Sequence, residues 1–193
     1  MPAVEIRPAR PEEYAGAGAI VVAAYRALPG APTGELGGYA AELADVAGRA
    51  AGAEVLVAAD GTALLGCVTF VRDPSSPLAE HLWPDEAAIR MLGVDPAAQG
   101  RGVGAALVDA CVTRARAAGR AAVFLHSTPW MAAAHRLYER AGFQRTPGRD
   151  WQPLPEVPLL AFRLALVGPG PAGGGVPGAG GDMSVSEICL RDT

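Results

Sequence analysis

The sequence predicts a single-domain α/β fold, and three observations support this prediction. Short apolar segments typical of strands alternate with segments of helical periodicity between Ile6 and Leu164, an order typical of layered α/β proteins. The length of 193 residues suits one domain. Half of the residues are hydrophobic, so the chain has enough apolar surface to bury a core.

The composition changes after residue 167, and we expect the folded domain to span residues 1–167. The segment Gly168–Gly181 contains eight glycines and three prolines in fourteen residues. Such a segment buries too little apolar surface to offset the entropy lost when it becomes ordered. We therefore expect residues 168–193 to form a disordered tail.

Turn-forming residues divide the N-terminal half of the domain into its elements. Pro11 opens a segment of helical periodicity. The dipeptide Asp60-Gly61, between two apolar runs, is a strong hairpin signal. The expected elements are a strand at Val4–Arg7, helices at Pro11–Tyr25 and Tyr39–Ala50, and strands at Glu54–Ala58 and Ala63–Arg72.

Glycines mark the ends of two helices in the C-terminal half, because glycine readily adopts the left-handed conformation that follows a helix. Gly119 and Gly142 occupy these positions, and the prolines between Asp73 and Glu86 indicate a long loop. The expected elements are a strand at Ala87–Val94, a helix from Gly102 to Ala118, a strand at Ala122–His126, a helix at Met131–Ala141 and a last strand at Leu159–Leu166.

The composition argues against several classes of partner. A net charge of −4 without a long basic stretch argues against nucleic acid. The three cysteines are far apart and the histidines lack metal-ligand spacing, so no metal is expected. No apolar run reaches the roughly 18 residues of a membrane span, and the N-terminus lacks the pattern of a signal peptide. We therefore expect a cytoplasmic protein that does not bind membranes.

The segment from Gln99 to Ala105 has the features of an anion-binding loop at the start of a helix. It follows a strand, and its glycines allow the backbone to approach a bulky ligand closely. The first N–H groups of a helix have no partner inside it, and the helix dipole adds partial positive charge. Arg101 adds a full charge nearby. Together these features predict a pyrophosphate site.

Three kinds of phosphate-binding loop place glycines at the N-terminus of a helix, and two of them do not fit this sequence. A P-loop requires a lysine after its last glycine, and this chain contains no lysine. Gly100, Gly102 and Ala105 satisfy the G-x-G-x-x-G/A pattern of dinucleotide-binding folds. Those folds also need a glycine directly at the strand end and an acidic residue at the end of the next strand. Here residues 95–99 intervene, and the next strand ends in His126-Ser127.

The third kind of loop fits. Gln99-x-x-Gly102-x-Gly104 resembles the Q/R-x-x-G-x-G/A loop of the GNAT superfamily of acetyl-CoA-dependent N-acetyltransferases. Residues Ala134–Phe143, which read A-x-x-L-Y-x-x-x-G-F, are similar to a second block of that family. The two blocks begin about 35 residues apart with one strand between them, as in the family. The resemblance covers roughly residues 4–166.

This resemblance implies a fold and a co-substrate. The expected fold is a mixed, mostly antiparallel, twisted sheet of six or seven strands, flanked by about four helices and split between its two central strands. The pantetheine arm of acetyl-CoA would enter this split, without any metal. Leu92 and Val94 would bind the arm, and the Val94 N–H would stabilise an oxyanion on the thioester carbonyl. The residues expected to hold the pyrophosphate are Gln99, Gly100, Arg101, Gly102, Val103, Gly104 and Ala105.

The resemblance also implies catalytic residues. Tyr138 matches the family tyrosine that protonates the departing CoA sulfur, because a phenol of pKa about 10 keeps its proton at neutral pH. The alternative is that Tyr138 only packs on its helical face. Many relatives carry a glutamate base at the position of Ala88, so Glu86, two residues earlier, is the candidate base here. Glu86 either acts through water or is a solvated carboxylate at the strand end, and Asp85 and Glu80 are weaker candidates.

The predicted function is transfer of an acetyl group from acetyl-CoA to the primary amine of an unidentified acceptor, by direct attack with both substrates bound. The alternative is a catalytically silent acyl-CoA-binding sensor or interaction module, because Ala88 replaces a glutamate and Met131 an asparagine that are common in relatives. Ser127 or Thr128 could replace the polar contact that the asparagine makes.

The acceptor should be recognised by residues 25–39, 73–86 and 146–158. The acidic side chains of these segments either suit a cationic amine or are only solvated. The resemblance also allows a homodimer.

Overall fold

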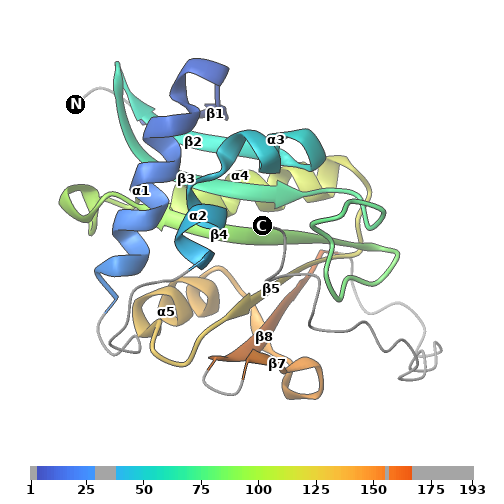
Figure 1. Cartoon of the computed structure of the whole chain (residues 1–193). Helices are drawn as coiled ribbons and strands as arrows, with labels where there is room; N and C mark the ends of the chain where they lie inside the picture. The colour runs from blue at the N-terminus through green and yellow to red at the C-terminus, as the bar shows by residue number, and fades with distance from the viewer. Residues whose placement is uncertain (1–3, 29–37, 155–156, 167–193) are drawn as a thin grey trace, which may run out of the picture.

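The computed structural model describes residues 4–28, 38–154 and 157–166, which form one mixed sheet covered by helices (Figure 1). Within these residues the sheet has eight strands in the order β1-β2-β3-β4-β5-β8-β6, and β7 pairs with β8. All neighbours are antiparallel except β4 and β5. The strands are β1 (Glu5–Pro8), β2 (Glu54–Asp60), β3 (Ala63–Val71), β4 (Glu86–Val94), β5 (Ala122–Ser127), β6 (Gln144–Arg145), β7 (Trp151–Leu154) and β8 (Val157–Ala165).

Helices cover both faces of the sheet. In Figure 1, α1, α2 and α3 lie in front of the strands and α4 lies behind them. The helices are α1 (Tyr14–Arg26), α2 (Gly38–Ala44), α3 (Val46–Gly52), α4 (Val103–Ala117) and α5 (Ala132–Arg140), with 3-10 turns at Pro11–Glu13, Pro96–Ala98 and Pro147–Arg149. None of the helices in the described ranges is long and apolar enough to cross a membrane.

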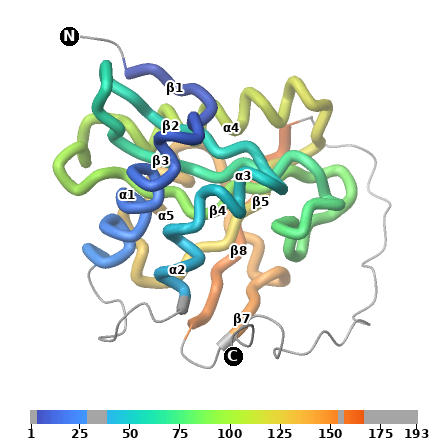
Figure 2. The backbone as a smooth tube through the Cα atoms, turned by 45° about the horizontal axis from the view of Figure 1, so that its top comes forward, coloured from blue at the N-terminus to red at the C-terminus, as the bar shows by residue number. Residues whose placement is uncertain are grey.

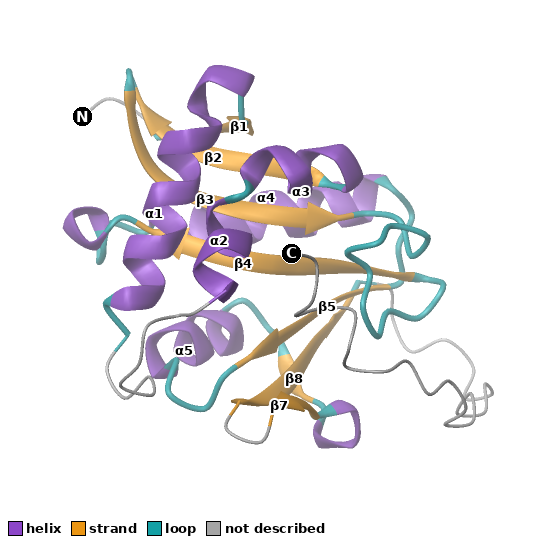
Figure 3. Ribbon diagram, viewed as in Figure 1, coloured by secondary structure: helices purple, strands orange, loops and turns teal. Residues whose placement is uncertain are grey.

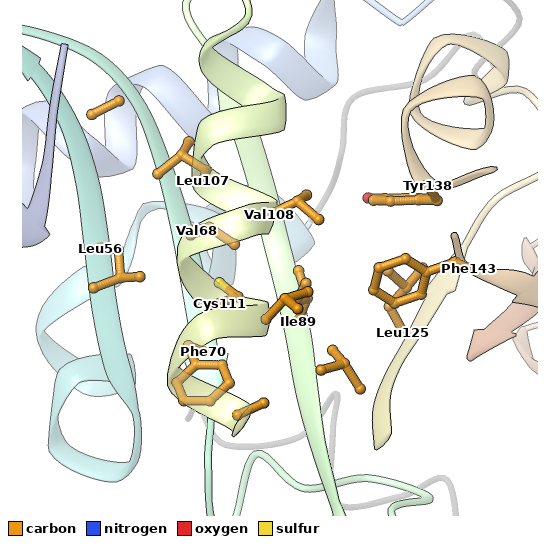
Figure 4. Close-up of a cluster of buried hydrophobic side chains, with 14 of the residues drawn as sticks. Leu56, Val68, Phe70, Ile89, Leu107, Val108, Cys111, Leu125, Tyr138 and Phe143 are labelled. Atoms are coloured by element: carbon orange, nitrogen blue, oxygen red, sulfur yellow. The ribbon is translucent and has the colours of Figure 1, made fainter. Parts of the chain in front are cut away.

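Alternation along the strands divides the core into two layers. Successive residues of a strand point to opposite faces of a sheet. On β2, Leu56 and Ala58 join the cluster beneath α4, whereas Val55 and Val57 join the cluster beneath α1, α2 and α3. The layer beneath α4 also includes Tyr138 of α5 (Figure 4). The sheet therefore lies between two apolar layers, each covered by helices.

The observed architecture confirms the predicted mixed, mostly antiparallel sheet with flanking helices. The additional strands are short: β6 has two residues and β7 has four, too few for a clear alternating pattern. The single helix expected at Tyr39–Ala50 is two helices, because Asp45 interrupts it. The Asp45 carboxylate accepts a hydrogen bond from the Gly48 N–H at 2.8 Å and so caps α3. The predicted tail at 168–193 lies outside the described residues.

The parallel pair β4 and β5 stays together for only three positions. Glu86, Ala87 and Ala88 pair with Ala122, Val123 and Phe124, in that order. Beyond Ala88 the two strands diverge, and Figure 3 shows them as the arms of a V that share one end. In Figure 2 the blue-to-green strands β1–β4 and the orange strands β7 and β8 form the two halves of the molecule on either side of this opening. The sheet is therefore split at its centre, as predicted.

Candidate functional site

The connection after β4 ends in a set of unpaired backbone N–H groups. The first hydrogen bond within α4 runs from the Ala106 N–H to the Gly102 carbonyl at 3.0 Å, so the N–H groups of the first three helical residues have no partner within the helix. Gly100 and Gly102 have φ angles of 77° and 80°, a left-handed conformation that favours glycine. No heavy atom lies within 4 Å of the position a Cβ would take at either residue. The loop is therefore open to an incoming anion.

The same connection is held in a fixed shape by its neighbours. The Asp95 N–H donates to the Leu65 carbonyl of β3 at 2.9 Å, and the Asp95 carboxylate accepts from the Ala97 N–H at 2.8 Å. Arg101 is half-exposed, and its guanidinium lies 3.4 Å from the Asp60 carboxylate. Because the loop shape is set before any ligand binds, its N–H groups need little reorganisation to bind one.

A β-bulge lies in β4 within the diverging part of the strand. Thr69 of β3 pairs with Arg90 and Cys67 pairs with Gly93, so two residues of β4, Met91 and Leu92, face one residue of β3. Met91 is buried and has a φ of 52°, an uncommon conformation for a residue other than glycine. Such backbone distortions often occur at functional sites.

The predicted arm-binding residues lie beyond the last pair between β4 and β5. Leu92 belongs to the bulge, and Val94 ends the strand. The Asp95 N–H points to β3, and consecutive residues of a strand direct their backbone groups to opposite edges. The Val94 N–H and carbonyl therefore point to the β5 side, into the opening of the V. This is the orientation that an added extended chain requires.

Tyr138 lies on α5 within the core beneath α4 and is 5% exposed. Its ring centroid is 5.9 Å from those of Phe143 and Phe162, and its hydroxyl end points towards Val108 on α4 (Figure 4). Burial raises the pKa of the Tyr138 phenol, and the nearby Cys111 thiol adds to this effect. The phenol therefore keeps its proton throughout the neutral range. The ring packs in the core, and Tyr138 is not among the residues that line the pocket described below.

Glu86 has the surroundings of a structural ion pair. It is the first residue of β4 and is fully buried. Its carboxylate accepts hydrogen bonds from Arg149 Nη1 at 2.9 Å, Arg163 Nε at 2.7 Å and the Trp83 N–H at 3.2 Å. Glu86 does not line the pocket described next. These contacts join β4, β8 and the turn before β7, and they leave the carboxylate poorly suited to act as a base.

A pocket of about 270 Å³ begins where β4 and β5 separate. All three segments expected to recognise the acceptor contribute to it: Tyr25 and Tyr39, Glu80, and Trp151 with Pro153. The other lining residues come mainly from the two diverging strands and from β8. They are Glu42, Ala88, Ile89, Arg90, Met91, Phe124, Leu125, His126, Ser127, Thr128, Met131, Val157 and Leu159.

The hydroxyl groups of the pocket differ in their availability. Ser127 Oγ lies 3.5 Å from Met131 Sδ and 3.2 Å from His135 Nε2, so protein groups already engage it. Thr128 Oγ1 is buried and has no hydrogen-bond partner among the described residues. Of the two residues considered as a replacement for the missing asparagine, Thr128 is therefore the one whose hydroxyl has no partner among the described residues.

Sequence reasoning gave no role to His126 or Glu42. His126 lies on β5 two positions beyond the last pair with β4, and its Nε2 is 3.0 Å from the Arg149 carbonyl. Glu42 lies on α2, and desolvation raises the pKa of its carboxyl, with Glu80 adding to the increase and Arg90 opposing it. A histidine at the end of a strand has no distinctive sequence signal. Its position in the pocket depends on where the two strands separate.

The sequence of this chain is similar to the sequences of known acetyltransferases. Residues 22–143, more than half of the chain, match the sequence model of the acetyltransferase (GNAT) family. A mycothiol acetyltransferase from Beutenbergia cavernae is 43% identical over 76 residues, which cover 37% of this chain and 26% of that protein. A second, from Geodermatophilus obscurus, is 39% identical over 87 residues, covering 45% of this chain and 27% of that protein. The chain thus matches about a quarter of the length of these relatives.

Solved structures share the fold at low sequence identity. An acetyltransferase of the GNAT family from Staphylococcus aureus superposes with a TM-score of 0.66 at 12% identity, covering 86% of this chain and 100% of that chain. A GNAT family acetyltransferase from Brucella melitensis, solved in complex with acetyl-CoA, gives a TM-score of 0.55 at 23% identity, covering 90% and 95%.

The buried ion pairs of Glu86 lead to a stability prediction. Glu86→Gln keeps the size of the side chain but leaves Arg149 and Arg163 without a carboxylate partner. We expect the free energy of unfolding, measured by urea denaturation, to fall by about 3 kcal/mol, the scale for breaking a buried ion pair. Glu80→Gln, which removes the surface ion pair with Arg90, is the matched control and should cost about 0–1 kcal/mol. Equal losses in the two variants would contradict the structural role of Glu86.

Proposed function

The chain belongs to the GNAT family of acetyltransferases, and on this basis we propose that it transfers an acetyl group from acetyl-CoA to a primary amine while both substrates are bound. The observation that carries the proposal is the arrangement at the end of β4. The unpaired N–H groups at the start of α4 lie directly after the diverging strand, and the pocket begins where that strand leaves β5. One continuous segment, from the end of β4 to the start of α4, can therefore hold both a diphosphate group and a reactive thioester.

We assign the co-substrate to the residues whose geometry suits it. The free N–H groups and the helix dipole at the start of α4 suit the pyrophosphate, and the open space around Gly100 and Gly102 suits its bulk. Arg101 adds positive charge. The β5-facing backbone groups of Val94, together with Leu92, suit the pantetheine amides. The complete proposed set is Leu92, Val94, Gln99, Gly100, Arg101, Gly102, Val103, Gly104 and Ala105.

The proposed reaction is a direct transfer. A neutral amine in the pocket attacks the thioester carbonyl carbon, the Val94 N–H stabilises the negative charge that develops on oxygen, and the C–S bond then breaks. Tyr138 donates its phenolic proton to the leaving sulfur and regains a proton from the acylated nitrogen. The raised pKa of Tyr138 suits this role, because the phenol is in its donor form before the reaction.

The relatives share only part of their length with this chain. The mycothiol acetyltransferases are matched over only about a quarter of their length, so the match does not extend to the rest of each relative.

The second candidate function, a catalytically silent acyl-CoA-binding module, is favoured by one observation: Glu86 is held in ion pairs rather than directed into the pocket. The two functions differ in whether thiol is released.

The glycine loop gives a prediction for binding. Gly102→Asp should weaken CoA binding at least about 100-fold, because it places a carboxylate beside the N–H groups proposed to bind the pyrophosphate. Gly119→Asp is the matched control, since Gly119 also has a positive φ and open space but follows the opposite end of α4. Isothermal titration calorimetry measures the affinity of both variants for CoA. Unchanged affinity in Gly102→Asp would remove the assignment of the loop to the cofactor.

Tyr138 gives a prediction for catalysis. Tyr138→Phe should lower amine-dependent thiol release from acetyl-CoA by about 10²-fold or more, the usual scale for a general acid. Protein stability should change little, because the hydroxyl forms no hydrogen bond with the described residues. Tyr14→Phe, in the first turn of α1, is the control and should keep full activity. A wild-type protein that binds CoA but releases no thiol with any amine would instead be the silent module.

A further inference from the structure

Aromatic rings form two walls of the pocket between the diverging strands. On the helical side, Tyr25 of α1 and Tyr39 of α2 make an edge-to-face pair with centroids 6.2 Å apart. On the side of β5 and β7, the His126 ring lies 4.8 Å from Phe124 and 6.2 Å from Trp151. Most of the remaining lining residues are aliphatic or methionine. The interior therefore suits a flat, apolar body.

The charged residues of the pocket carry a net negative charge. Glu42, Glu80 and Arg90 line it. Arg90 is already engaged, because its guanidinium lies 3.1 Å from the Glu80 carboxylate and donates to the Leu78 carbonyl at 2.9 Å. Glu42 forms no ion pair with any residue that the structure describes. Glu42 is an exposed residue that lines the pocket together with the two tyrosines, and a carboxylate there suits an organic ammonium group, which also interacts favourably with aromatic rings.

The part of the pocket formed by β5 and the following turn offers few side-chain hydroxyls to a hydroxyl-rich ligand. Ser127 is engaged by Met131 and His135, and the Thr128 hydroxyl, unpaired among the described residues, is itself buried. A buried hydroxyl without a hydrogen bond costs free energy. An amino sugar, with several hydroxyls, is therefore a poor fit, and a volume of about 270 Å³ favours a small molecule.

We propose that the acceptor is a small primary amine carried on a flat, apolar body, of the arylalkylamine class, with its ammonium group recognised by Glu42. This proposal rests on the proposed acetyl transfer for its chemistry, but binding of the amine can be measured without turnover. It narrows the acceptor from any amine to one class.

The test compares 2-phenylethylamine and tryptamine with D-glucosamine and spermidine, by calorimetry on the CoA-loaded protein and by thiol release from acetyl-CoA. We expect the two aromatic amines to bind and to have kcat/KM values at least about tenfold higher. Glu42→Gln should raise KM for 2-phenylethylamine about tenfold and leave KM for acetyl-CoA unchanged. Glu12→Gln removes the same charge outside the pocket and is the control.

The outcomes separate this proposal from the proposed function. Aromatic amines that bind in a Glu42-dependent way without any thiol release would support the pocket assignment and overturn acetyl transfer. Equal or better use of glucosamine or spermidine would overturn the arylalkylamine class while leaving acetyl transfer intact. Aromatic amines that neither bind nor react would also overturn the arylalkylamine class.

A second inference rests on a different contact, the hydrogen bond between His126 and the Arg149 backbone. A carbonyl only accepts hydrogen bonds, so the His126 Nε2 that lies 3.0 Å from the Arg149 carbonyl carries the hydrogen. In the neutral ring Nδ1 then holds the lone pair. Arg149 is itself fixed, because its guanidinium binds Glu86 and stacks over the Phe124 ring at 3.7 Å. The buried Glu86 thus positions the backbone that sets the His126 tautomer.

We infer that Nδ1 of His126 is the base that takes the proton from the acceptor ammonium. The R–NH₃⁺ group loses one proton to the imidazole, the freed lone pair attacks the thioester carbon, and the imidazolium passes its proton to water. Desolvation lowers the pKa of His126, as do the nearby His81, Arg149 and Arg90, against the opposing effect of its hydrogen bond to the Arg149 carbonyl. The ring is therefore neutral, and able to accept a proton, at neutral pH.

The pH dependence of kcat tests this role. With 2-phenylethylamine, or the best amine of the panel, wild-type kcat should fall as the pH decreases through a value below 6.5, the usual pKa of histidine. His126→Gln should lose this acid limb and about 10²-fold in kcat, with KM for acetyl-CoA unchanged. In His126→Ala, which leaves space for the ring, added imidazole should restore part of the rate. His135→Gln, outside the pocket, should keep the wild-type profile.

Thermal unfolding of these variants shows whether the fold is retained, and rescue by imidazole distinguishes a lost base from a distorted site. A His126→Gln enzyme that keeps the wild-type kcat and acid limb would overturn the inference. So would a low activity of His126→Ala that imidazole does not raise.

Discussion

The site depends on the early end of pairing between β4 and β5. Parallel strands that pair along their whole length satisfy each other's backbone groups and leave no space between them. Here the ladder stops after three positions, while β5 stays paired with β8 through Ser127 and β4 stays paired with β3 to Val94. The separation therefore creates both a line of free backbone groups on β4 and the pocket between the strands. Each remaining part of the site is arranged around this opening.

The two ends of β4 stabilise the opening in different ways. At the shared end, buried Glu86 is held by Arg149 and Arg163, which ties β4 to β8 and the turn before β7. At the far end, the bulge at Met91–Leu92 and the hydrogen bonds of Asp95 direct the chain into the glycine loop. Breaking the ion pairs of a buried carboxylate costs much free energy, because a charged partner left alone remains desolvated. The contacts at both ends of β4 therefore connect the strand to its neighbours on each side of the opening.

The structure also changes the interpretation of the acidic residues. From the sequence, Glu86 is attractive as a base because it lies two positions before Ala88 on the same face of the strand. In the folded chain its carboxylate is fully engaged, while His126 and Glu42 lie in the pocket. Glu86 and His126 are nevertheless connected, because both contact Arg149. The residue predicted as the base from the sequence is thus linked, through Arg149, to a histidine that lines the pocket.

The sequence by itself determined the fold class, the order of the main elements and the glycine loop. These features depend on local signals: period, turn dipeptides, and glycines that adopt positive φ at 100 and 102. Tertiary structure alone decided which carboxylate is buried, where β4 and β5 separate, and that His126 faces the pocket beside Trp151. Each of these depends on contacts between residues far apart in the chain, such as Glu86 with Arg163. Periodicity and motif spacing describe neighbours along the sequence, so they carry no information about such pairs.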